Sequence, residues 1–412
     1  MEKLNKFVSE HIADDIARLI LDRNKWSGID MDLAVSCIES RRKLKGKIQE
    51  WYDQPDLIFP IKLSAEQCSS SATGRYKAII ADQITESRWR LADLTGGLGV
   101  DSWFFAQKAE AVLYNEMQKP LCQAAEHNFK ALGMTNITIS NHAISNTDDP
   151  ATAAVTPTSL LKEFRPDIVY MDPARRGDGG KKVFLIEDCT PDVLTLKDEI
   201  FTICRHILIK LSPMADISML CDRLGKECRE VHVIASGSEC KELLIWMDKE
   251  WNDEYSIKAV EIHNDGTVSD FTFKPSEERS ARAEVADMTG SYLFEPGKAL
   301  MKSGAFNLIS QRSGVGKLGV STHYFLTDDL TKVEKLQRLG KIFMIKEILP
   351  LDKRSIKQIG KKYPKAEVTA RNIPMDTDTL RKKLGVTSGD DAHIFGLKSD
   401  INGNILIAAK KF

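Results

Sequence analysis

An aspartate-proline pair, Asp172-Pro173, directly follows the apolar run DIVYM and precedes two arginines, Arg175 and Arg176. A strand over this run would place Asp172 at the carboxyl edge of a sheet, where open α/β folds bind ligands, and Pro173 would fix the backbone after it. A carboxylate and a backbone carbonyl can accept both hydrogens of an exocyclic amine and so direct its lone pair at an electrophile. We therefore predict Asp172, Pro173 and Arg175 as catalytic residues, since an arginine can stack on a base or hold a phosphate. The alternative is that Asp172 caps a turn and that the arginines are solvated.

A glycine-rich turn, Thr95-Gly96-Gly97-Leu98-Gly99, lies between the apolar run RLAD and a helical stretch around Trp103. Glycines there allow the backbone to turn sharply and to approach a ligand closely, while the following helix presents free N–H groups. Glu116 ends the next apolar run, AVLYN, and would lie beside this turn, where a carboxylate can bind ribose hydroxyls. The turn lacks the last glycine of the dinucleotide pattern, which disfavours nicotinamide and flavin binding. An ordinary strand-to-helix turn is the alternative.

The elements that must position these residues form a repeating pattern. Seven short apolar runs lie between residues 91 and 247, most of them separated by helical lengths: LADLT, AVLYNE, ITISN, DIVYMD, HILIKLS, VHVIAS and ELLIWM. Repeated alternation of strand and helix predicts an α/β fold with a largely parallel sheet covered on both faces. The five residues GSECK are too few for a crossover helix between the last two runs, so these two strands should be antiparallel.

These motifs resemble those of the class I S-adenosylmethionine-dependent methyltransferases over about residues 60 to 250. The resemblance implies a Rossmann-like sheet of seven strands, mostly parallel, whose last strand inserts antiparallel. It also implies S-adenosylmethionine as the cofactor and the following cofactor-binding residues: Asp93, Thr95, Gly97, Gly99, Glu116, Met117 and His142.

The resemblance assigns a part of the cofactor to several of these residues. Asp93 would orient the methionine end, Glu116 would bind the ribose, and Met117 would flank the adenine ring. His142, or its neighbour Asn141, would replace an aspartate that the family often directs at adenine. The alternatives are that Met117 fills the core and that His142 is a structural polar residue.

Asp172-Pro173 resembles the Asp/Asn-Pro-Pro-aromatic motif of amino methyltransferases, with two departures. Ala174 stands in the third position and Arg175 replaces the aromatic residue, which weakens the case for adenine N6 as the acceptor. The loop is closer in character to RNA methyltransferases, and the motifs are similar to those of the guanine-N2 enzymes of small-subunit ribosomal RNA. The resemblance implies methylation of a base amino group in rRNA or tRNA.

The charge of the chain is unevenly distributed. The formal net charge is −1, yet residues 331–412 hold 18 Lys and Arg against 9 Asp and Glu. Basic clusters at 361–365 and 381–383 suit contacts with phosphates, although a solubilising surface would explain them equally well. The segments AEVTARNIPMDTDTLRKKLG and AHIFGLK resemble a THUMP-like domain, and that resemblance implies RNA as a partner.

The same patterns predict four regions along the chain. These are an N-terminal helical region over 1–60, a class I methyltransferase domain over 61–275, a small α+β linker domain over 276–330 and a small α+β THUMP-like domain over 331–412. The N-terminal region carries five basic residues that could extend a basic surface: Arg41, Arg42, Lys43, Lys45 and Lys47. The oligomeric state cannot be predicted.

Other features limit the partners and the compartment. The eight cysteines include no C-x-x-C pair, so no metal is expected. No apolar stretch approaches the roughly 20 residues of a membrane-spanning helix, and the acidic start lacks the apolar run of a signal peptide. We therefore expect no membrane association and a cytoplasmic location.

Two other functions remain open from the sequence. The chain could be an RNA-binding protein that keeps a cofactor-like pocket without turnover. It could also be a methyltransferase for a small molecule or a protein, with a basic tail that only solubilises it.

Overall fold

The computed structural model describes residues 2–85, 88–152, 154–175, 185–287 and 290–412. It contains two compact units, formed by residues 1–231 with 242–253 and by residues 232–241 with 254–412. The finer division into four domains remains a prediction. None of the helices in the described ranges has the length and apolar character that a membrane span requires.

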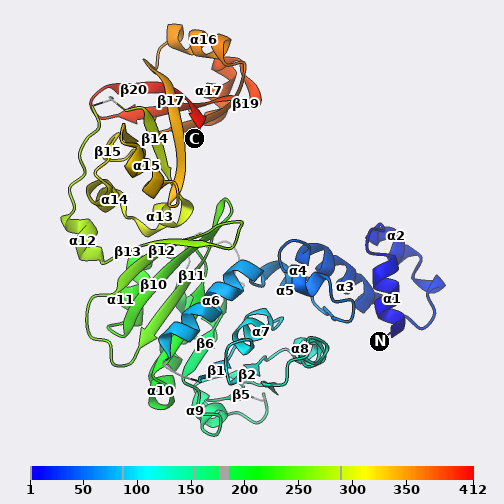
Figure 1. Cartoon of the computed structure of the whole chain (residues 1–412). Helices are drawn as coiled ribbons and strands as arrows, with labels where there is room; N and C mark the ends of the chain where they lie inside the picture. Colours follow the sequence, from blue (N-terminus) through cyan, green and yellow to red (C-terminus); the bar gives the residue numbers. More distant parts are fainter. Residues whose placement is uncertain (1, 86–87, 153, 176–184, 288–289) are drawn as a thin grey trace. The chain divides into compact units, whose positions relative to one another are not determined.

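All seven predicted strands are present, and they lie centrally among the helices in Figure 1. They are β1 (Arg90–Asp93), β2 (Ala111–Asn115), β3 (Ile137–Ser140), β6 (Ile168–Met171), β9 (His206–Leu211), β10 (Cys228–Ser236) and β11 (Glu239–Asp248). β1 is parallel to β2 and β6, β2 to β3, and β6 to β9. β11 is antiparallel to β9 and also neighbours β10, which precedes it by a two-residue turn. The predicted antiparallel insertion of the last strand is confirmed.

Local sequence explains where the helices beside this sheet begin. They are α6 (Ser71–Ile84), α7 (Val100–Ala106), α8 (Lys119–Ala131), α9 (Pro157–Leu161), α10 (Val193–Ile203) and α11 (Ile217–Leu224). Ser70 caps α6 in a capping box with Thr73, and aspartates cap α10 and α11. Four short strands complete this part: β4 (Ala143–Ile144), β5 (Ala154–Val155), β7 (Ala174–Arg175) and β8 (Cys189–Thr190).

The first helices are α1 (Glu2–Glu10), α2 (Ile16–Leu21), α3 (Met31–Leu44), α4 (Gln49–Tyr52) and α5 (Lys62–Gln67). Asp30 caps α3 and accepts a hydrogen bond from Leu33 N. The expectation of a basic surface here is wrong for Arg41, whereas Arg42, Lys43 and Lys45 are exposed. Arg41 is buried and donates to the carbonyls of four residues between 52 and 57. Arg42 and Lys47 also donate to backbone carbonyls, and Lys43 forms an ion pair with a glutamate. Arg41, Arg42 and Lys47 thus supply donors to carbonyls of helix ends and loops.

The second unit contains an antiparallel pair, β12 (Ser256–Ile262) and β13 (Val268–Phe273), around a turn with Gly266 at φ +81°. In the described residues this pair extends the large sheet beside β10, and the sheet therefore has nine strands where seven were predicted. A sheet with the order β15-β16-β14-β17-β20-β19-β18 follows. Its strands are β14 (Tyr292–Pro296), β15 (Gly316–Lys317), β16 (Phe325–Thr327), β17 (Gly340–Pro350), β18 (Lys365–Arg371), β19 (Thr387–Ser399) and β20 (Gly403–Lys411). The helices are α12 (Pro275–Ser280), α13 (Lys298–Ser303), α14 (Phe306–Ser313), α15 (Leu330–Leu336), α16 (Lys353–Lys362) and α17 (Thr377–Leu384).

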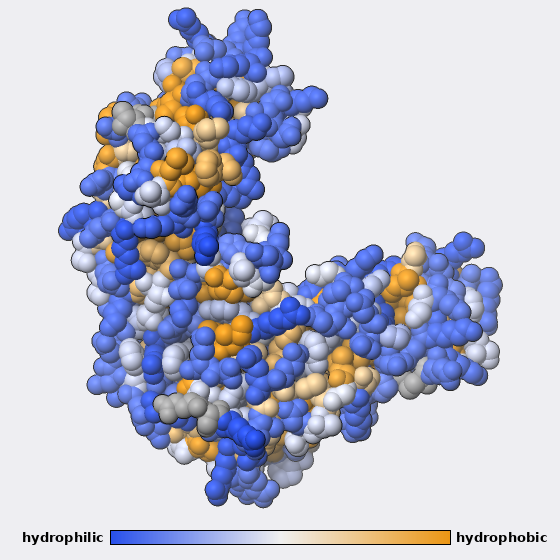
Figure 2. Space-filling model, in the orientation of Figure 1, coloured by the Kyte–Doolittle hydropathy of each residue, from blue (hydrophilic) through white to orange (hydrophobic). Residues whose placement is uncertain are grey.

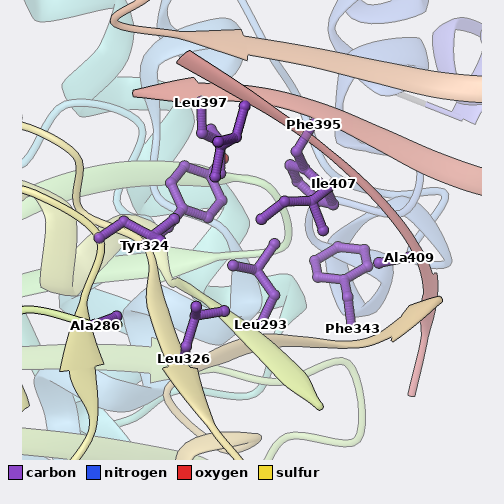
Figure 3. Close-up of a cluster of buried hydrophobic side chains, with 11 residues drawn as sticks. Ala286, Leu293, Tyr324, Leu326, Phe343, Phe395, Leu397, Ile407 and Ala409 are labelled. Carbon is purple, nitrogen blue, oxygen red and sulfur yellow. The ribbon is translucent and has the colours of Figure 1, made fainter. Parts of the chain in front are cut away.

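One hydrophobic core joins the strands of this sheet across residue 331. Leu293 and Leu326, from β14 and β16, pack with Phe343, Phe395 and Ile407, from β17, β19 and β20, as Figure 3 shows. Removing the strands on either side of residue 331 would therefore expose the apolar side chains of the other strands to water.

Candidate active site

Asp93 ends β1 as a buried carboxylate. Its Oδ1 accepts a hydrogen bond from Thr95 N at 3.0 Å, and its Oδ2 accepts one from Ser102 Oγ at 2.5 Å. Burial raises the pKa of Asp93 to about 7; the two hydrogen bonds lower it, and the nearby Asp101 and Asp172 raise it. Asp93 therefore changes charge near neutral pH, which is unusual for an aspartate.

The glycine turn is held by backbone conformation and by close packing. Gly97 and Gly99 have φ angles of +54° and +89°, in the left-handed region that favours glycine. A Cβ on Gly99 would lie 2.7 Å from the ring of buried Phe129, whereas the nearest atom to a Cβ on Gly97 is 3.8 Å away. The backbone at Gly97 thus lies beside open space that a ligand can use.

We expect Gly99→Ala to lower the free energy of unfolding by about 3 kcal/mol or more, because a strained φ adds to overpacking against Phe129. The matched variant Gly97→Ala carries the strain without the clash and should cost only about 1 to 2 kcal/mol. Urea denaturation of both variants measures the difference. Equal losses would show that packing against Phe129 contributes nothing to the choice of glycine.

The predicted ribose-binding and adenine-binding residues lie at the same edge of the sheet. Glu116 is buried, and its two oxygens accept hydrogen bonds from Gln118 N at 2.7 Å and from Gly97 N at 2.9 Å. The side chain of Met117 is exposed over 60% of its surface. His142 follows β3, where its N–H donates to Asn115 Oδ1 at 3.1 Å and its Nδ1 lies 2.8 Å from Ser140 Oγ. These contacts bring the ends of β2 and β3 to the glycine turn.

Asp172 connects the glycine turn to the next two strands of the sheet. Its N–H donates to Thr95 Oγ1 at 2.6 Å, and its Oδ2 forms an ion pair with Lys210 on β9. The backbone of Arg175 lies in β7, which is antiparallel to β8. The side chain of Arg175, and Arg176 with the residues up to 184, lie outside the described part of the chain. The catalytic role of Arg175 therefore stays a prediction.

A cluster of buried charged residues, Lys77, Asp101 and Glu242, was not predicted. Lys77 on α6 is fully buried and pairs with Asp101 Oδ1 at 3.2 Å and with Glu242 Oε1 at 2.6 Å. Asp101 Oδ2 also accepts hydrogen bonds from Tyr170 Oη at 2.7 Å and from Ser69 Oγ at 3.0 Å. Burial raises the pKa of Asp101, but Lys77 and Lys210 outweigh burial and the pKa is lowered. Charged residues within apolar runs, such as Lys210 in HILIKLS, are the sequence signal for this cluster.

Comparisons with known proteins agree with the observed fold. Residues 340–411 match a THUMP domain-like family model, and residues 292–333 match a model of a ferredoxin-like domain. The crystal structure of a putative methyltransferase from Porphyromonas gingivalis W83 is similar over 99% of this chain and 97% of that chain, with a TM-score of 0.84 and 28% identity. An rRNA methylase from Streptococcus thermophilus is similar over 42% of this chain and 94% of that chain, with a TM-score of 0.29 and 11% identity. No curated protein matches the sequence.

The glycine turn, the Asp172-Pro173 motif and the buried charges all lie in a fold that this chain shares with a known structure. The sheet order and the similarity over nearly the whole chain confirm the predicted methyltransferase fold, and the C-terminal match confirms the predicted THUMP-like domain.

Proposed function

We propose that this protein is an S-adenosylmethionine-dependent methyltransferase that modifies a base amino group of RNA. The observation that carries the proposal is the hydrogen bond from Asp172 N to Thr95 Oγ1 at 2.6 Å. This hydrogen bond places the Asp172-Pro173 motif next to the glycine turn. A methyl donor bound at the turn and an amino group bound by Asp172 would therefore be neighbours. Such positioning supplies most of the catalysis when the donor is already activated.

The residues at this edge fit the proposed cofactor. Glu116 uses one lone pair of each oxygen for backbone N–H groups, and a carboxylate has about four such sites, so two remain for ribose hydroxyls. Gly97 leaves space beside its backbone, and exposed Met117 offers an apolar surface to a ring. Asp93 ends β1 directly before the turn, and its oxygens each accept one hydrogen bond, from Thr95 N and from Ser102 Oγ, so lone pairs remain for the amino group of the methionine moiety.

When bound, S-adenosylmethionine supplies an electrophilic methyl group, whose bond to sulfur breaks as the electron pair stays with the sulfur. The chain's part is to prepare the acceptor nitrogen. Asp172 and the Pro173 carbonyl accept its two hydrogens, which localises the lone pair that forms the new N–C bond. The nitrogen then loses one proton to the Asp172 carboxylate, and the neutral methylated amine remains.

Support for RNA as the substrate comes from the C-terminal region. The THUMP-like match covers the segment that carries the predicted basic clusters. On α16, Lys353, Lys357 and Lys361 are exposed at four-residue spacing, which puts them on one face of the helix. The end of the molecule with α16 and α17 is largely hydrophilic in Figure 2. A row of cations of this kind can neutralise successive phosphates.

Calorimetry with S-adenosylmethionine tests the cofactor site. We expect wild-type protein to bind it and Glu116→Ala to lose at least about 100-fold in affinity, because two ribose hydrogen bonds are removed and two backbone donors lose their acceptor. The matched control is Glu126→Ala, which removes an exposed glutamate paired with Lys130 on α8. Wild-type protein that binds no S-adenosylmethionine would contradict the proposal.

Methyl transfer to RNA separates the proposal from the other functions. We expect Asp172→Ala to lower kcat by about 10² to 10³-fold while RNA and cofactor still bind. An RNA-binding protein without turnover would show no transfer in the wild type. For a small-molecule or protein substrate, the triple variant Lys353→Glu/Lys357→Glu/Lys361→Glu would keep full activity. Substitutions are used because a deletion of residues 331–412 would disrupt the core that these residues share with β14 and β16.

A further inference from the structure

Lys210 lies beside Asp172 because the strands β6 and β9 are parallel and in register. The register pairs Tyr170 with Leu208 and Met171 with Ile209, so Asp172 and Lys210 are the next positions on the two strands. The ammonium of Lys210 pairs with Oδ2 of Asp172. Within the described ranges no donor contacts the other oxygen, Oδ1, and 38% of the Asp172 side chain is exposed. Among the described residues, Lys210 holds one oxygen of Asp172, and the other has no donor.

The charge of Lys210 is maintained by its surroundings. Its side chain is only 12% exposed and lies in an otherwise buried strand, where an unpaired cation would be costly. Burial lowers the pKa of Lys210, but the carboxylates of Asp172, Asp101 and Glu242 outweigh burial, and the pKa is raised. The ammonium therefore stays protonated throughout the neutral range, and its ion pair with Asp172 persists there.

We infer that Lys210 is a positioning residue that holds Oδ2 of Asp172 so that Oδ1 is the oxygen presented to the acceptor amino group. This inference rests on the proposed function, in which Asp172 binds the acceptor. The backbone of Asp172 is fixed separately, by its hydrogen bond to Thr95 Oγ1. A carboxylate held at both its backbone and its side chain needs little reorganisation during the reaction, which is how preorganised polar groups accelerate transfer.

A double-mutant cycle on methyl transfer to RNA tests the inference. We expect Lys210→Met to lower kcat by about 100-fold, with S-adenosylmethionine affinity within about twofold of wild type, since in the described part of the chain Lys210 contacts Asp172 and none of the predicted cofactor residues. Asp172→Asn should cost at least as much, and the double variant should be no slower than Asp172→Asn alone, because residues that act through one another are not additive. Lys210→Arg keeps a cation that can pair with Oδ2 and should recover part of the lost kcat.

Thermal unfolding of the wild type, Lys210→Met, Asp172→Asn and the double variant, all without cofactor, supplies a second readout. The shift in Tm of the double variant should be smaller than the sum of the single shifts, and Lys108→Met, which removes an exposed lysine paired with Asp82, should change neither kcat nor this coupling. Additive effects on kcat would overturn the inference and leave a structural role. An active wild type with an equally active Lys210→Met overturns the inference alone, whereas a wild type that transfers no methyl group overturns the proposed function and the inference together.

Discussion

Replacing Asp93 by asparagine is expected to raise the free energy of unfolding at pH 8 by about 4 kcal/mol while it weakens the binding of S-adenosylmethionine. Burial raises the pKa of Asp93 from 3.8 to about 7 in the folded protein. Each pKa unit corresponds to about 1.36 kcal/mol, so the ionised carboxylate at pH 8 costs about 4 kcal/mol relative to the protonated one. Asparagine carries no such cost and keeps an acceptor for Thr95 N, while the Ser102 hydroxyl can reverse its role and accept.

The pH dependence gives the sign of this effect. A folded-state pKa above the unfolded value means that the folded protein holds the proton more tightly, so wild-type stability from this group is complete below about pH 4 and falls as the pH rises through 7. The advantage of Asp93→Asn should therefore be absent near pH 4 and largest near pH 8. Urea denaturation at pH 4, 6 and 8 measures it.

A surface aspartate supplies the control. Hydrogen bonds from Trp89 and Lys108 lower the pKa of Asp82, so Asp82→Asn should lose a little stability at neutral pH, opposite in sign to Asp93→Asn. A constant difference between Asp93→Asn and wild type from pH 4 to pH 8 would contradict the prediction.

Cofactor affinity is measured on the same samples, and we expect it to fall at least about 10-fold in Asp93→Asn, because the charge-assisted hydrogen bonds are lost. Such a trade of stability for binding is common where an active site holds a buried charge.

The strand ends of the first unit could be predicted because an apolar run is a local property of the sequence. Asp93, Glu116 and Asp172 each follow or end such a run, and parallel strands bring their carboxyl ends to one edge. The antiparallel last strand followed from a connection too short for a helix. The hydrogen bond between Thr95 and Asp172 could not be predicted, because it depends on which strands are neighbours: β1 lies next to β6 although other strands separate them along the chain.

The buried charges could be detected in the sequence only as an incomplete pattern. Lys210 interrupts an apolar run and Glu242 begins one, and charges in buried strands require partners. The sequence does not identify those partners, because Lys77 and Glu242 are 165 positions apart. Arg41 shows the converse error. Charge density indicated a basic surface there, but Arg41 is buried and donates to backbone carbonyls of a folded loop, which composition does not reveal.

Lys77→Met is expected to lower the free energy of unfolding by about 3 to 5 kcal/mol, the usual cost of removing one partner from a buried ion pair. Lys77 is fully buried, and methionine can fill its volume, so lost packing contributes little to this figure. The loss arises because Asp101 and Glu242 keep their desolvation cost without the cation that compensates it. The double variant Lys77→Met/Glu242→Gln, which removes one of these charges, should recover part of the stability.

At acidic pH, Lys77→Met should lose less free energy of unfolding relative to wild type than it does at pH 8. In the wild type, burial raises the pKa of Asp101 while Lys77 and Lys210 lower it further than burial raises it, so this carboxylate stabilises the fold above about pH 4 and loses that effect as the pH falls through its folded pKa. Without Lys77 the pKa of Asp101 must rise. Asp101 is then protonated at a higher pH in the variant than in the wild type, and protonation removes the cost of burying its charge. Urea denaturation at pH 5 and pH 8 should show a smaller gap between variant and wild type at pH 5. Lys108→Met, which breaks an exposed pair with Asp82, should cost no more than about 1 kcal/mol at either pH. If Lys77→Met lost no more free energy of unfolding than Lys108→Met, the prediction would be wrong. The buried ion pairs would then contribute little to the packing of α6 and α7 against the sheet.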